Sequence, residues 1–199
     1  GANVVFADAD DKAVKRGVLH MMNNTGQSCN APSRMLVQRP IYDQAVETAA
    51  AVAAKVTVGN AHEEGRHIGP VVNELQWTKI QDLIQKGIDE GARLIAGGTG
   101  RPDGLNKGYY VKPTIFADAI AIANDTVYGL TNYVQTQDPA RANRMARALR
   151  SGMVEMNGKS RAAGSPFGGM KQSGNGREGG TWGLEDFLEV KAVAGWTAE

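Results

Sequence analysis

The sequence predicts an α/β protein with an open, twisted, largely parallel sheet flanked by helices and a strand-like tail at the C-terminus. Three observations support this fold class. Short apolar runs alternate with amphipathic helical patterns, the 199 residues suffice for one substantial core, and a further apolar run follows the last helical pattern. Strands that are separated by helices pair in parallel, because each helix returns the chain to the same end of the sheet.

The first half of the chain alternates strands with helices. The apolar run at 3–7 predicts a strand, and Asp8 and Asp10 are candidate caps for a helix with apolar residues at Val14, Val18 and Met21. The turn residues at 23–26 end that helix. The further predicted elements are a strand at 34–38, a helix over 42–56, a loop at 58–70, and a helix with its apolar face at Trp77, Ile80, Ile84 and Ile88 that ends at Gly91.

The second half continues the alternation and then changes character. Strands are predicted at 93–96, 109–116, 133–136 and 153–156, with a helix over 142–149. Glycines then concentrate between 158 and 183, but Phe167 and Trp182 interrupt them, so this stretch is an ordered loop rather than a low-complexity linker. The strand-like run 187–196 has no obvious partner, which predicts pairing with another element or subunit.

The composition excludes several classes of protein. Lys and Arg number 22 against 21 Asp and Glu, so a general polyanion-binding role and a nucleic-acid partner are not expected. No apolar run is long enough to cross a bilayer and the N-terminus lacks a signal-peptide pattern, so no membrane partner is expected. The three histidines have no metal-like spacing, which predicts no metal site.

The single cysteine, Cys29, is the candidate nucleophile. It lies in a predicted turn after a helix, where Gln27, Ser28 and Asn30 offer polar groups to a thiolate or to the oxygen of a bound carbonyl. A lone cysteine excludes an internal disulfide and suits a reducing, cytoplasmic compartment. Taken by itself, a lone cysteine is more often an inert small apolar side chain than a nucleophile.

A second motif makes a nucleophile the better interpretation of Cys29. The segment Gly26-Gln27-Ser28-Cys29 is followed at long range by P-F-G-G-x-K-x-S-G-x-G-R-E at 166–178, with matching segments at 41–43, 68–70, 90–92, 113–114 and 124–130. In this order the motifs resemble the catalytic half of NAD(P)-dependent aldehyde dehydrogenases, over nearly all of the chain. The resemblance implies a catalytic domain at 1–185, a C-terminal strand or oligomerisation tail at 186–199, and a homodimer or homotetramer.

The resemblance also implies a chemistry. Cys29 would attack the aldehyde carbon, its own backbone N–H would hold the oxyanion, hydride would pass to NAD or NADP, and water would hydrolyse the thioester to a carboxylic acid. Gln76 and Lys79 match a pair that reaches the adenosine ribose of the cofactor in some relatives.

A second group of residues is implied to lie near the aldehyde. Asn157 and Phe167 match positions near the active site, and the loop between them lines the aldehyde tunnel in relatives. Lys159 and Arg161 in this loop would suit an aldehyde that also carries a carboxylate, although a solvated loop face is the more common role for such charges. Asn157 also has a purely structural reading.

Parts of the family pattern are missing from the sequence. The nucleotide-binding domain with its oxyanion asparagine is absent, the Glu-Leu-Gly-Gly motif would lie immediately before Gly1, and a segment with Glu-x-Phe-Gly-Pro is missing between Asp118 and Ala119. We therefore expect the 199 residues alone to give no turnover. Two alternatives stay open: an inactive α/β oligomerisation module or truncated fragment, and an aldehyde dehydrogenase that transfers the acyl group to coenzyme A.

Overall fold

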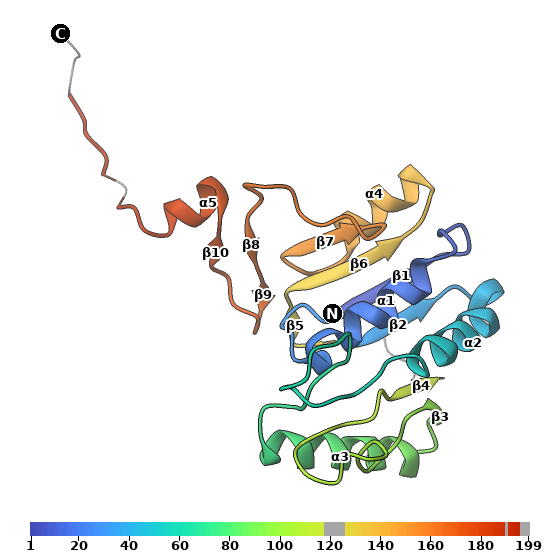
Figure 1. Ribbon diagram of the computed structural model, residues 1–199. Coiled ribbons are helices and arrows are strands. Elements are labelled where there is room, and N and C mark those ends of the chain that lie inside the picture. The colour runs from blue at the N-terminus through green and yellow to red at the C-terminus, as the bar shows by residue number, and fades with distance from the viewer. Residues whose placement is uncertain (118–125, 190, 196–199) are drawn as a thin grey trace.

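The protein has a four-stranded parallel sheet at its centre. The computed structural model describes residues 1–117, 126–189 and 191–195. The sheet has the order β2-β1-β6-β7, formed by Arg34–Val37, Ala2–Val5, Thr131–Gln135 and Met153–Met156 (Figure 1). All three strand pairs are parallel. The predicted open, largely parallel sheet flanked by helices is therefore confirmed.

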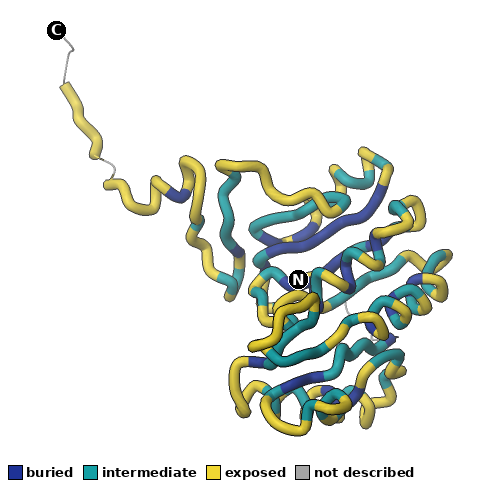
Figure 2. Tube along the Cα trace, in the orientation of Figure 1, coloured by how far each residue is buried: buried dark blue, intermediate teal, exposed yellow. Residues whose placement is uncertain are grey.

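The two inner strands form the most buried part of the chain. Every residue of β6 is buried, and Ala2, Val5 and Val134 are almost fully inaccessible to solvent (Figure 2). Parallel strands that are covered on both faces carry few exposed side chains. The ends of these strands are therefore firm positions from which loops can present functional groups.

Two helices pack together beside this sheet. Helices α1 (Ala13–Met22) and α2 (Tyr42–Ala53) contact each other through Val18, Met22, Ala49 and Ala53. The helix predicted over 42–56 thus ends three residues early. Helix α4 (Pro139–Ala148) begins at Asp138, whose side chain accepts from the backbone N–H groups of Ala140 and Arg141.

A second small layer lies beyond β2. It consists of α3 (Glu74–Asp89) and an antiparallel pair of strands, β3 (Arg93–Ala96) and β4 (Ile115–Ala117) (Figure 1). Its core contains Val71, Ile84 and Val111. Trp77 packs against this core, as predicted, and its indole N–H donates to the Tyr110 carbonyl at 2.8 Å.

Two local predictions were wrong. The strand predicted at 109–116 forms only from Ile115, because the carbonyls of Tyr109 and Tyr110 accept from the Val71 N–H and the Trp77 indole instead of a neighbouring strand. Asp8 does not cap α1; its carboxylate accepts from backbone N–H groups at 137 and 138, just before α4. Asp10 does bond the start of α1, through the Lys12 N–H at 3.0 Å.

The glycine-rich stretch is more regular than the ordered loop that we predicted. It contains β8 (Phe167–Gly168), β9 (Met170–Lys171), β10 (Arg177–Glu178) and helix α5 (Gly180–Glu185). Strand β10 pairs with β8, and β9 pairs with β5 (Tyr128–Gly129). A side chain at Gly152 would collide with the Gly168 carbonyl, so glycine there lets this segment approach β7.

The C-terminal tail extends away from the rest of the chain (Figure 1). At 187–189 and 191–195 it forms no strand and is exposed along its length (Figure 2). Phe187 is 86 % exposed. The predicted pairing with another subunit stays a prediction. The junction between Asp118 and Ala119 lies outside the described residues. Among the described helices, none is both long and apolar enough to cross a bilayer.

Candidate active site

Cys29 lies on a tight turn between α1 and β2. Helix α1 ends at Met22 and continues into a short 3-10 turn at Asn23–Gly26, in which Asn24 and Thr25 have φ angles of 51° and 57°. The Ala31 N–H then donates to the Ser28 carbonyl at 3.0 Å, which places Cys29 and Asn30 at the centre of the next turn. The thiol is free and exposed, as the sequence predicted for a candidate nucleophile.

The Gln27 side chain anchors this turn to the loop before α3. Its amide oxygen accepts from the Val72 N–H at 2.9 Å, and its amide nitrogen donates to the carbonyls of Asn24 and Pro70. The Thr25 hydroxyl donates to the Gly69 carbonyl at 2.9 Å in the same region. Gln27 therefore holds the backbone that carries Cys29 and offers its amide to backbone groups of the protein.

The other side of the turn is anchored by β6. The Tyr133 hydroxyl donates to the Asn30 carbonyl at 2.8 Å and lies 3.4 Å from Nε2 of His20. Burial raises the pKa of the Tyr133 phenol, and the negative charges of Glu155 and Cys29 raise it further. Burial also raises the pKa of Glu155, while the charge of His20 lowers it. Sequence reasoning missed Tyr133 and Glu155, and it considered His20 only among three histidines whose spacing does not suit a metal site.

Cys29 opens onto a polar cavity of about 420 Å³. Ser28 and Asn30 flank Cys29 in the turn but are not among the residues that line the cavity, whose walls include Arg34 from the start of β2, Asn132 from β6 and Ser173 from the glycine-rich stretch. The Asn132 side chain is already bonded to the Ala2 N–H and the Ser151 hydroxyl. Cys29 therefore remains the candidate nucleophile, exposed at a cavity with hydrogen-bonding walls.

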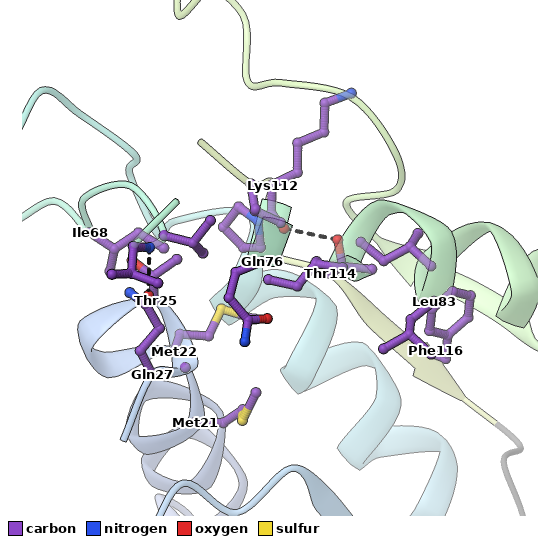
Figure 3. A pocket seen from close by; sticks show the side chains of 17 residues that line it. Met21, Met22, Thr25, Gln27, Ile68, Gln76, Leu83, Lys112, Thr114 and Phe116 are labelled. Carbon is purple, nitrogen blue, oxygen red and sulfur yellow. Dashed lines mark hydrogen bonds between the residues drawn. The ribbon is translucent and has the colours of Figure 1, made fainter. Parts of the chain in front are cut away.

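A larger and more apolar cavity of about 680 Å³ lies on the α3 side of the turn (Figure 3). Thr25, Gly26 and Gln27 line it, together with Met21, Met22, Val71, Ile80 and Lys112, and the Gln76 side chain projects into it. Lys79, which was predicted to act with Gln76, is exposed on α3 and is not among the lining residues. The structure thus places Gln76 and Cys29 on two neighbouring cavities.

The four remaining predicted residues lie away from both cavities. Asn157 has a φ of 52°, and its side chain bonds both the N–H and the carbonyl of Thr136 at 2.9 Å. Arg161 lies over the Phe167 ring at 5.1 Å and donates to the Ser165 carbonyl. Lys159 is exposed. The structural reading of Asn157 accounts for both of these side-chain hydrogen bonds, and Arg161 is engaged with its own loop and with Phe167.

Within residues 1–117, 126–189 and 191–195, no three or more side chains of the metal-ligating types lie close enough together to hold a metal ion.

Comparisons with known proteins point to one family. The model of the Aldehyde dehydrogenase family matches residues 1–119 and 116–193. A 3-succinoylsemialdehyde-pyridine dehydrogenase from Pseudomonas sp is 45 % identical over 223 positions, covering 98 % of this chain and 47 % of that protein. A putative aldehyde dehydrogenase from Staphylococcus aureus is 41 % identical over 221 positions, covering 97 % of this chain and 46 % of its own length.

Solved structures agree with this assignment. The aldehyde dehydrogenase of Bartonella henselae superposes with a TM-score of 0.94 at 52 % identity, covering 98 % of this chain and 47 % of that one. Aldehyde dehydrogenase C of Pseudomonas syringae, a cysteine-to-alanine variant solved with NAD⁺ and octanal, gives 0.93 at 38 % identity and covers 100 % of this chain and 47 % of its own. The chain spans about half the length of the relatives that it matches.

Proposed function

The chain belongs to the aldehyde dehydrogenase family, and from this we propose that it is the catalytic portion of an enzyme that oxidises an aldehyde to a carboxylic acid. The observation that carries the proposal is the placement of the only cysteine: an exposed thiol at the centre of a hydrogen-bonded turn, facing a polar cavity. A nucleophile needs both access for the substrate and a fixed direction of approach.

Cys29 would act as the nucleophile. The thiolate forms a C–S bond to the aldehyde carbon, and the carbonyl π electrons move to oxygen as an oxyanion. The Cys29 N–H makes no hydrogen bond within the described part of the chain, so it remains free to donate to that oxyanion. After loss of hydride, water cleaves the thioester, which yields the carboxylic acid and restores the thiol.

NAD or NADP would accept the hydride when bound. The cavity beside Gln76 has room for one nucleoside portion of such a cofactor, and the Gln76 amide projects into it, which fits a ribose hydroxyl. Lys79 lies one turn further along the same helix and is exposed. Several related structures contain NAD⁺, which supports the cofactor class and leaves the choice between NAD and NADP to experiment.

We propose a cytoplasmic homodimer or homotetramer that is joined through the tail at 186–199. The free thiol of Cys29 supports a reducing compartment. Phe187, Leu188 and Val193 are exposed apolar side chains on the extended tail, and such a segment gains stability when another chain covers it. The partner expected at the active site is a small aldehyde. Arg161 stacks on Phe167 and bonds Ser165, which favours a role on the solvated face of the loop over binding the carboxylate of a substrate.

We also propose that the 199 residues alone give no turnover. The family model matches in two segments that meet at 116–119, and the alignment with the Pseudomonas relative spans 223 positions, more than this chain has residues. Both observations support a missing internal segment at the junction of Asp118 and Ala119. The relatives are about twice as long, so cofactor contacts from their other half are expected to be essential.

The test compares the chain alone with a joined protein. The joined protein carries the missing half and internal segment of the Bartonella henselae relative, and octanal-dependent reduction of NAD⁺ and NADP⁺ is followed by cofactor absorbance. We expect no turnover from the chain alone and turnover from the joined protein. Cys29→Ala should abolish it, whereas Gln44→Ala, on the exposed face of α2, should retain it. Equal turnover with and without the Cys29 thiol would refute the proposal, and a dependence on added coenzyme A would favour the acylating alternative.

A further inference from the structure

A cluster of three titratable side chains lies directly beneath the Cys29 turn. Tyr133 comes from β6, Glu155 is its cross-strand partner on β7, and His20 lies in the last turn of α1. The imidazole of His20 meets the Tyr133 ring edge to face, with ring centroids 5.0 Å apart and an interplanar angle of 60°. Three elements that are distant in the sequence therefore converge at one phenol group.

The Tyr133 phenol is a fixed hydrogen-bond donor. Tyr133 is 4 % exposed as a residue and lies on the most buried strand of the sheet, so packing holds the ring in place. Burial, followed by the charges of Glu155 and Cys29, raises the pKa of the phenol, so the hydroxyl stays protonated at neutral pH. A protonated hydroxyl donates one hydrogen bond, and here the acceptor at 2.8 Å is the Asn30 carbonyl.

That carbonyl belongs to the residue after the nucleophile. Cys29 and Asn30 are the two central residues of the turn that the Ala31 N–H closes onto Ser28. Fixing the Asn30 carbonyl therefore fixes the peptide plane on the C-terminal side of this pair. Gln27 anchors the preceding residues to the loop at 70–72, so the turn is held from both ends.

We propose that Tyr133, supported by His20, is a positioning residue that holds the Cys29 turn in the orientation required for attack on the substrate. His20 contributes by packing edge to face against the ring and by placing Nε2 3.4 Å from the phenol oxygen. The inference rests on the proposed role of Cys29 as nucleophile. Neither side chain touches the substrate or takes part in bond making.

The test uses Tyr133→Phe in the full 199-residue chain, since this change removes one oxygen atom and keeps the ring. Amide hydrogen exchange reports how firmly the turn is closed. We expect the Ala31 amide to exchange about fivefold faster when the hydrogen bond from the Tyr133 hydroxyl to the Asn30 carbonyl is absent. Alkylation of Cys29 by iodoacetamide is measured as a function of pH. We expect its high-pH plateau to fall about twofold or more, because the sulfur is no longer held toward its cavity.

Tyr128→Phe is the matched control. Tyr128 lines the same cavity as Cys29, is 60 % exposed, and its hydroxyl makes no hydrogen bond within the described residues. It should leave both measurements at their native values. In a folded Tyr133→Phe protein, a native value for either the Ala31 exchange rate or the alkylation plateau overturns the proposal.

A second variant keeps the test decisive if Tyr133→Phe does not fold. His20→Leu leaves the phenol in place and removes Nε2. We expect a smaller increase in the Ala31 exchange rate and a smaller fall in the alkylation plateau than for Tyr133→Phe. A native value for either measurement would overturn the proposal. Neither measurement needs aldehyde turnover. A failure of the positioning role is therefore distinguishable from a failure of the proposed enzymatic function.

Discussion

The turn that carries Cys29 and the loop that follows β7 are held in opposite ways. The turn is tied to distant parts of the chain, through Gln27 to the loop at 70–72 and through Tyr133 to β6. The loop at 158–166 is tied mainly to itself: Arg161 bonds Ser165 and stacks on Phe167, and at its base Asn157 bonds Thr136, the residue that follows β6.

This difference separates two parts of one predicted active site. A nucleophile must be placed to within a fraction of an ångström, which requires anchors in a rigid scaffold. A loop that shapes the entrance to a site can be held more loosely, and its final position then depends on whatever packs against it. We therefore expect substitutions in the loop to lower the free energy of unfolding most at its base and least at its tip. We also expect the Cys29 turn to be destabilised when side chains that contact it from distant parts of the sequence are changed.

The largest effect on stability is expected at the base of the loop. Asn157→Ala removes two hydrogen bonds to Thr136 and places alanine at a φ of 52°, so we expect the free energy of unfolding to fall by about 2–3 kcal/mol. Asn157→Gly loses the same bonds and tolerates this φ, so its cost should be about 1–2 kcal/mol. Urea denaturation measures both, and equal costs for the two variants would contradict the contribution of backbone strain.

An intermediate effect is expected in the turn. Gln27→Ala removes the anchor to Val72 and Pro70, and because this residue is exposed we expect a loss of only about 1 kcal/mol. Gln44→Ala on the exposed face of α2 is the control, since its side chain makes no hydrogen bond in the described structure, and it should stay within about 0.5 kcal/mol of native. If the two variants unfold at the same urea concentration, the Gln27 anchor does not stabilise the fold.

Much of the fold was predictable because its signals are local. Apolar runs identified the strands of the parallel sheet, and helical spacing identified α1 to α4 within a few residues. The exception at 109–114 is instructive. Tyr109 and Tyr110 have the composition of a strand, but their carbonyls bond Val71 and the Trp77 indole, and no local pattern reveals partners more than thirty residues away.

The site was predictable only in part for the same reason. An exposed Cys29 in a turn followed from the residues around it, and the structure agrees. Gln27, which holds one side of this turn, lies in the cysteine motif and was found, but Tyr133 and His20 on the other side could not be, because they belong to two different elements and carry no shared motif. A family resemblance identifies candidate site residues within the motifs. It does not identify the side chains outside the motifs that contact these residues in the folded protein.

The smallest effect is expected at the tip of the loop, and it tests the comparison most directly. Arg161 is exposed, stacks on Phe167 and makes one hydrogen bond to the Ser165 carbonyl, so Arg161→Ala should change the free energy of unfolding by no more than about 0.5 kcal/mol. Arg161→Lys keeps the charge without the planar group, and should behave like the native protein. A loss of about 2 kcal/mol or more would mean that the loop is braced as firmly as the Cys29 turn, because only a buried or multiply bonded side chain costs that much to remove. The distinction between an anchored nucleophile and a loosely held entrance would then fail.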